Sequence, residues 1–273
     1  MSGGNSNPGR SVTSKVLAIL DAFGPADPRL TLTELGQRTS LPLATVHRLC
    51  AELVEWGGLE RDERGAYRIG MRLWEVGSLT PERSGLREIA IPFMENLYEA
   101  THENVQLAVL AYRDALFVEK ISGPQSVPIV TRVGGRLPLH ATGAGKALLA
   151  YGPPSLLEAL IAGGLPQLTP FTITDPDVLR RCMDEVRRNG FAYTRDEMTL
   201  GSVSVAAPIF GPDDTAIAAI SRVVRSATAD IGRLALGVRT AAVGVSRRVA
   251  EAWDGTWPSP GDDRHERSLS FTA

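Results

Sequence analysis

Apolar residues between positions 30 and 69 recur first at helical spacing and then at strand spacing. Thr31 with Glu34 three positions later is a capping-box pattern, so we expect a helix to begin there. Gly36 falls inside this helix, where it suits a second helix that crosses at close range, and Pro42 suits the first position of that second helix. The second helix has apolar residues at i, i+3, i+4 and i+7, which predicts a buried stripe of Val46, Leu49, Cys50 and Leu53.

Two short strands are predicted directly after the second helix. Gly57 and Gly58 end that helix, and residues 59–62 and 66–69 have the composition of strands around a turn at 63–65. Two helices joined by a turn and followed by such a β-wing are typical of a winged helix-turn-helix domain. We therefore predict this domain, mainly α with a β-wing, at residues 10–75, with a leading helix at 12–23.

The face of the second helix opposite its apolar stripe carries the candidate DNA contacts, which are Ala44, Thr45, His47 and Arg48. In a major groove, Arg can bond guanine O6 and N7, Thr can bond a phosphate or a base edge, and Ala can touch a thymine methyl. Arginines of the wing could reach phosphates or the minor groove, namely Arg61, Arg64 and Arg68. The helix face alone would fit an ordinary solvated surface equally well, and a winged unit can also serve protein contacts only. The wing favours double-stranded operator DNA as the partner.

Strand-like and helical segments follow one another in mixed order beyond a linker at 76–82. Strands are predicted at 105–111, 116–121, 127–133, 191–195, 203–210 and 215–224, and helices from about 80 and at 143–151, 154–161, 175–188 and 231–253. In the helix at 175–188, the apolar residues Val178, Cys182 and Val186 are expected to share one face. The mixed order predicts an α+β domain at 83–255, between polar end segments, 1–9 and 256–273, that we expect to be disordered tails.

Composition changes this picture little. The 273 residues carry a net charge of −2, and the first seventy-five residues hold nine Lys and Arg against nine Asp and Glu, so DNA affinity would depend on locally placed arginines and on dimerisation. The two cysteines lie far apart and are expected to be reduced, and neither a metal-binding pattern nor a cofactor motif is present. Without a signal peptide or an apolar run of membrane-spanning length, we expect a cytoplasmic protein that does not enter a membrane.

A glycine-rich segment at 143–145 is the strongest candidate for a binding site in the second domain. Gly143, Ala144 and Gly145 leave backbone N–H groups uncovered where a helix begins, which is a suitable site for a carboxylate. A phosphate-binding P-loop does not fit, because His140 stands where its first glycine would be and Ala147 replaces the Ser or Thr that would hold Mg²⁺. Small residues that simply allow close packing at a helix start are the remaining alternative.

Several segments together resemble the IclR-type family of transcriptional regulators. The segments at 30–35, 41–49 and 58–62 are similar to the DNA-binding half of that family, and those at 132–150, 190–197 and 201–209 are similar to its effector domain. The resemblance implies a GAF-like effector-binding domain after the winged one, and a homodimer or a dimer of dimers. It implies a regulator that responds to a small-molecule effector, for which we expect an organic acid and repression rather than activation.

The resemblance also implies an effector pocket whose residues can be carried over by position, namely Gly143, Ala144, Thr194, Ser204, Ser221 and Val223. Thr194 stands where the best-known small-acid sensor of the family has an acidic side chain, Ser204 where it has a thiol, and Val223 where it has a hydroxyl. The pocket is therefore less acidic and partly more apolar. We expect an organic acid with a larger apolar part, such as an aromatic acid.

An enzyme acting on a small acid, with an appended winged-helix domain, is the alternative function. It would need a nucleophile, a metal set or an acid/base pair. Asp196 and Glu197 are adjacent on a predicted strand, so their side chains should point to opposite faces, and His140 has no recognisable catalytic partner in the sequence. We therefore expect a regulator that is not an enzyme and has no catalytic residues.

Overall fold

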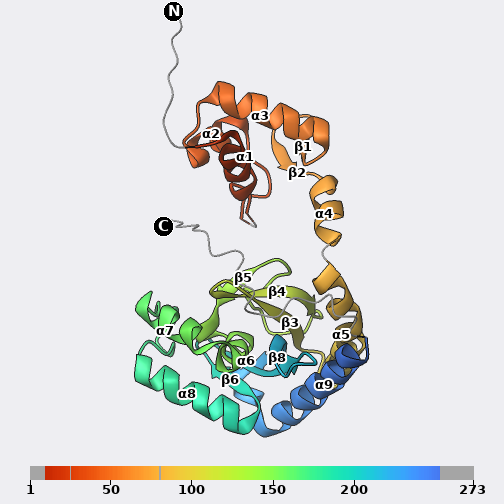
Figure 1. The fold of residues 1–273 in the computed structure, drawn as a ribbon, viewed down its shortest axis with the longest axis vertical. Helices are drawn as coiled ribbons and strands as arrows, with labels where there is room; N and C mark the ends of the chain where they lie inside the picture. Colours follow the sequence, from red (N-terminus) through yellow and green to blue (C-terminus); the bar gives the residue numbers. More distant parts are fainter. Residues whose placement is uncertain (1–9, 25, 80, 253–273) are drawn as a thin grey trace, which may run out of the picture. The chain divides into compact units, whose positions relative to one another are not determined.

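The structure of the chain is a computed structural model that describes residues 10–24, 26–79 and 81–252 (Figure 1). The two predicted tails, 1–9 and 256–273, lie outside the described residues. Residue contacts divide the chain into two compact units, Met1–Thr80 and Pro81–Ala273, and the division falls within the predicted linker at 76–82. Within that linker, residues 76–78 are the last turn of a helix and Pro81 begins the next one.

The first unit is a winged helix-turn-helix domain, as predicted. Its elements are α1 (Val12–Asp21), α2 (Leu32–Thr39), α3 (Leu43–Trp56), β1 (Leu59–Arg61), β2 (Tyr67–Ile69) and α4 (Met71–Ser78). The two strands are antiparallel, with Glu60 opposite Arg68. Residues of α1, α2, α3 and both strands share one apolar core, because each helix presents a single apolar stripe toward the others.

Local sequence signals set the two helices of the helix-turn-helix. Both bonds of the capping box between Thr31 and Glu34 are present, and Ser40 in a left-handed conformation (φ 54°) ends α2. An added Cβ at Gly36 would lie 2.7 Å from the Leu43 side chain, so the two helices do cross closely there. Pro42 is the N-cap of α3 rather than its first residue, so that prediction was wrong by one position. The predicted stripe is buried, and burial raises the pKa of the Cys50 thiol to about 11.

The second unit is an α+β domain of the predicted GAF-like kind. Its elements are α5 (Pro81–Glu99), β3 (Asn104–Ala111), β4 (Asp114–Ile121), β5 (Arg136–Pro138), the 3-10 turn η1 (Leu139–Ala141), α6 (Gly143–Tyr151), α7 (Pro154–Ala162), α8 (Pro176–Asn189), β6 (Ala192–Arg195), β7 (Ser202–Phe210), β8 (Ala216–Arg225), η2 (Ser226–Thr228) and α9 (Ile231–Glu251). The described strands of this unit form one antiparallel sheet in the order β5-β4-β3-β8-β7-β6.

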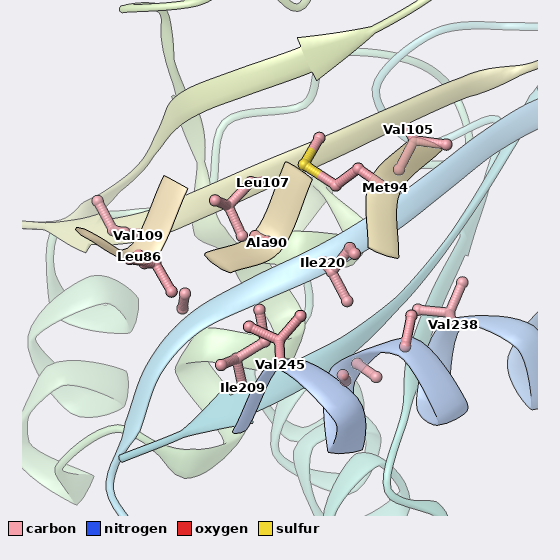
Figure 2. Packing of buried hydrophobic residues seen from close by; sticks show 14 of the residues in the cluster. Leu86, Ala90, Met94, Val105, Leu107, Val109, Ile209, Ile220, Val238 and Val245 are labelled. Carbon is pink, nitrogen blue, oxygen red and sulfur yellow. The ribbon is translucent and has the colours of Figure 1, made fainter. Parts of the chain in front are cut away.

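Helices cover both faces of this sheet, and strand alternation assigns each residue to one face. Figure 2 shows the first core, where Leu86, Ala90 and Met94 of α5 and Val238 and Val245 of α9 pack against the strands. The second core, on the opposite face, is formed with α6, α7 and α8. On β3 the odd-numbered residues 105, 107 and 109 join the first core, so the even-numbered ones point toward α6.

One prediction for the second unit was wrong, and one predicted apolar face is only partly buried. Residues 127–133 form no strand, because side chains rather than a neighbouring strand satisfy Val127: its N–H donates to Glu103, and its carbonyl accepts from the Asn104 side chain. The short strand β5 lies just after this segment instead. In α8, Val186 is buried and Cys182 packs partly buried against the second core, but Val178 is exposed, and Leu179 and Met183 of the neighbouring row are buried instead because that row faces α6 and the sheet.

Candidate functional sites

The candidate DNA-binding residues of α3 share one outward face. Ala44, His47 and Arg48 are exposed and Thr45 is half-buried, while the opposite stripe fills the core. The Arg48 guanidinium donates to the Glu52 carboxylate at 2.6 Å, and both side chains are more than half exposed. Such an exposed i,i+4 pair contributes little stability, so it leaves Arg48 able to exchange its partner for an acceptor on a base.

The three wing arginines differ in how they are held. Arg61 lies over the Tyr67 ring, 5.5 Å from its centroid, and Arg68 donates to the Glu60 carboxylate at 2.5 and 2.9 Å across the hairpin. Arg64 is exposed at the hairpin turn, whose shape is fixed because the Asp62 carboxylate accepts from the N–H groups of residues 64 and 66. Arg64 is thus the arginine of the wing best placed to reach a phosphate.

A pocket opens between the sheet and the start of α6, and its free volume is about 30 Å³, roughly that of one water molecule. It is narrow, so a bound molecule would have to widen it by moving side chains. Its wall consists of Gln106, Phe117, Ile129, Thr131, Leu137, Thr142, Ala144, Thr194, Met198, Thr199, Ser202, Ser204 and Val223. Hydroxyl groups and one amide stand beside apolar side chains, and none of these residues is Lys, Arg or His.

Four of the six predicted effector-site residues meet in this wall. Thr194, Ser204 and Val223 lie directly opposite one another on β6, β7 and β8, and form one row across the sheet. Ala144 comes from the first turn of α6. Antiparallel pairing therefore gathers residues that are far apart in the chain onto one surface.

The other two predicted residues lie just behind the wall. An added Cβ at Gly143 would stand 2.6 Å from the Ser204 hydroxyl, so this glycine allows the start of α6 to approach β7. Ser221 is fully buried on β8 and donates to the Gln106 side-chain oxygen at 3.3 Å. Neither lines the pocket directly. Gly143 lies against Ser204 and Ser221 bonds Gln106, and both Ser204 and Gln106 do line it.

The sequence reasoning missed Gln106, although a signal was present. Gln106 is the one polar residue within the apolar run from 105 to 111, and strand alternation places it on the α6 side of the sheet. The wall residues at 129, 131, 198, 199 and 202 lie in loops or at a strand start, where no periodic pattern points to them.

The start of α6 combines a pair of uncapped amides with tight packing. The Thr142 hydroxyl accepts from the Gly145 N–H at 3.1 Å, which leaves the first two amides of the helix, those of Gly143 and Ala144, without a capping bond. An added Cβ at Gly145 would lie 2.5 Å from the Leu139 carbonyl oxygen. Close packing therefore explains Gly145, and the anion-binding interpretation is confined to the two preceding amides.

Substituting Gly145 with alanine should lower the free energy of unfolding by about 1–3 kcal/mol, because the methyl group meets backbone that cannot move aside. Gly237→Ala in α9 is the matched control, since the nearest atom to its added Cβ is 3.5 Å away and alanine favours a helix. Urea unfolding followed by circular dichroism measures both. Equal stability of the two variants would contradict the packing explanation.

A buried ion pair ties α6 to the loop that forms one side of the pocket. The Lys146 ammonium donates to both carboxylate oxygens of Glu197, at 2.7 and 2.8 Å, and both side chains are at least nine-tenths buried. Burial raises the pKa of the Glu197 carboxyl, and the adjacent ammonium opposes that rise. Met198 and Thr199, the two residues after Glu197, line the pocket. The ion pair therefore fixes the position of this part of the pocket wall.

The groups considered for catalysis have structural partners. Asp196 has a positive φ of 59°, and its carboxylate accepts from the Gly201 N–H at 2.6 Å, closing the loop that also carries Glu197. A ring nitrogen of His140 lies 3.0 Å from the Pro166 carbonyl oxygen, and burial lowers the pKa of this histidine. Across the described ranges no three His, Cys, Asp or Glu side chains gather as metal ligands would, and no described helix combines the length and apolarity needed to cross a membrane.

Comparison with protein families gives two matches that together span most of the chain. Residues 12–63 match the model for the IclR helix-turn-helix domain. Residues 80–247 match the model for the bacterial transcriptional regulator IclR C-terminal domain. The first match contains α3 with Thr45 and Arg48, and the second contains the pocket and the Lys146–Glu197 pair.

Individual relatives agree with these matches. The chain is 37% identical over 208 residues to the HTH-type transcriptional regulator KipR of Bacillus subtilis, covering 76% of this chain and 83% of KipR. It is 32% identical over 209 residues to the transcriptional repressor IclR of Escherichia coli, covering 75% and 76%. A crystal structure of an IclR homolog from Microbacterium hydrocarbonoxydans, complexed with 4-hydroxybenzoate, is similar with a TM-score of 0.85 and 34% identity, covering 89% of this chain and 100% of that one. This chain therefore belongs to the IclR family of bacterial transcriptional regulators.

Proposed function

We propose that this regulator represses transcription from an operator and that a small aromatic acid controls its binding there. The outward face of α3, with Thr45 and Arg48, would enter the major groove, and Arg61, Arg64 and Arg68 of the wing would contact the backbone or the minor groove. One winged unit carries few arginines, so two copies would bind together as a homodimer or a dimer of dimers on a palindromic site. No catalytic step is needed for this function.

The composition of the pocket wall is the observation that carries the choice of effector. Apolar side chains, among them Phe117, Leu137 and Met198, would take an aromatic ring, and the uncapped amides of Gly143 and Ala144 would hold a carboxylate. The absence of a cationic side chain from the wall favours a single carboxylate held by N–H donors. The 4-hydroxybenzoate bound to the related protein is a molecule of this class.

Calorimetric titration with a panel of aliphatic and aromatic acids tests the effector, and a salt-dependent gel shift on the DNA upstream of its own gene tests the operator. We expect aromatic acids to bind more tightly than two-carbon acids and to change the affinity for DNA, because an effector regulates only if it favours one conformation over another. Binding confined to glyoxylate-sized acids would exclude the proposed effector. Turnover of a bound acid would favour the enzyme alternative.

A further inference from the structure

The side-chain amide of Gln106 is a buried polar group with an unmet hydrogen bond. Gln106 lies on β3, is 2% exposed, and forms part of the pocket wall. Its oxygen accepts from the Ser221 hydroxyl on the neighbouring strand β8 at 3.3 Å. Its nitrogen, Nε2, is buried in the described structure without a hydrogen-bond partner.

An unpaired buried donor lowers stability, because the group has lost its bonds to water and gained none in return. Gln106 stands between apolar neighbours in a strand where a leucine would pack without this loss. Ser221 does not satisfy the donor, since it bonds the other end of the amide and thereby fixes its orientation. The arrangement therefore suits an amide nitrogen whose missing hydrogen bond is made to a molecule that enters the pocket.

Besides the hydroxyl groups of its wall, the pocket then has N–H donors on two separate elements of the fold. The uncapped amide of Ala144, which lines the pocket, and that of Gly143 just behind it lie at the start of α6, and Gln106 lies on the sheet. A simple monocarboxylate would use the donors of only one of these elements. A molecule that carries a second oxygen substituent would use both.

We propose that Gln106 Nε2 donates a hydrogen bond to a hydroxyl or keto oxygen of the effector, and so selects oxygen-substituted acids over their unsubstituted analogues. This inference rests on the proposed function, because it assumes that the carboxylate is held at the start of α6. Ser221 is then a positioning residue that keeps the amide oxygen occupied and the amide nitrogen directed at the effector. A site built to bond an oxygen rejects the analogue that lacks it, because the donor stays unpaired in that complex.

Calorimetry with 4-hydroxybenzoate and benzoate on the wild-type chain, Gln106→Leu, Gln106→Glu and Ser221→Ala tests the inference. We expect the wild type to prefer 4-hydroxybenzoate by about tenfold or more. Gln106→Leu should lose that preference, and its benzoate affinity should stay within a few fold of wild type. Gln106→Glu should lose it too, because its carboxylate offers no donor, and Ser221→Ala should reduce it. An unchanged preference in Gln106→Leu would overturn the inference.

Thermal unfolding without any ligand gives a second, independent readout. The double variant Gln106→Leu/Ser221→Ala removes both buried polar groups, so its midpoint should equal or exceed that of the wild type. A lower midpoint would show that the amide serves the fold, and would overturn the inference whatever the titrations give. If the wild type binds neither acid while this midpoint rises, the proposed aromatic effector fails and the binding role of Gln106 is supported.

Discussion

Replacing Lys146 with methionine should lower the free energy of unfolding of the second unit by about 3–5 kcal/mol. Methionine has a similar length and fills the space, but it leaves the Glu197 carboxylate buried and without its cation. The remaining carboxyl must then be protonated or hydrated, and either change disturbs the loop with Met198 and Thr199. Denaturant unfolding monitored by circular dichroism gives the change in stability.

Two further variants identify the cause of that loss. Lys146→Met combined with Glu197→Leu removes both charges and should recover most of the stability, since a buried pair can often be replaced by apolar residues at little cost. Arg180→Met removes a cation from exposed pairs with Glu158 and Asp177 and should change stability little. A double variant no more stable than Lys146→Met alone would show that packing around α6, and not the charge, is responsible.

Arg48→Ala should abolish the preference for operator over unrelated DNA, with a loss of about 5- to 150-fold in operator affinity for each copy that contacts a base. Arg48 lies on the exposed face of α3, and its exposed partner Glu52 competes for it in the free protein. Footprinting and gel shifts on operator and on random DNA measure the two affinities. Effector affinity should remain that of the wild type, because Arg48 belongs to the first unit and the pocket to the second.

Glu52→Gln is the matched variant for this experiment. It keeps the shape of the side chain and removes the competing charge, so operator affinity should rise modestly and the salt dependence should change little. An Arg48→Ala protein with an unchanged footprint would contradict the placement of α3 in the groove. The same loss on every DNA sequence would instead place Arg48 on a phosphate.

The first unit could be predicted well because its signals are local. The capping box at Thr31, the stripe beginning at Val46 and the glycine after Trp56 each act within one or two helical turns. These short-range rules set where each helix begins and which face is buried. Pro42 was misplaced by one residue because a proline fits both the cap and the first turn.

The pocket could be predicted only in part, because the wall depends on pairing between distant strands. The family resemblance implies Thr194, Ser204 and Val223 as three separate positions. They form a single row only when β6, β7 and β8 pair in register. Gln106 and Ser221 are 115 residues apart, and their contact follows from the pairing of β3 with β8. The segment at 127–133 was misjudged for a related reason, since Asn104 and Glu103 hold it with side chains.

Because Cys50 is buried, the rate of its chemical modification can report how often the first unit opens. Its thiol lies in the core of the first unit and keeps its proton at neutral pH, so an alkylating reagent in solvent meets neither an accessible sulfur nor a thiolate. Modification then requires the helices to separate, so the modification rate depends on how often they do so. A labelling time course with and without duplex DNA would therefore measure how firmly an operator holds this unit closed.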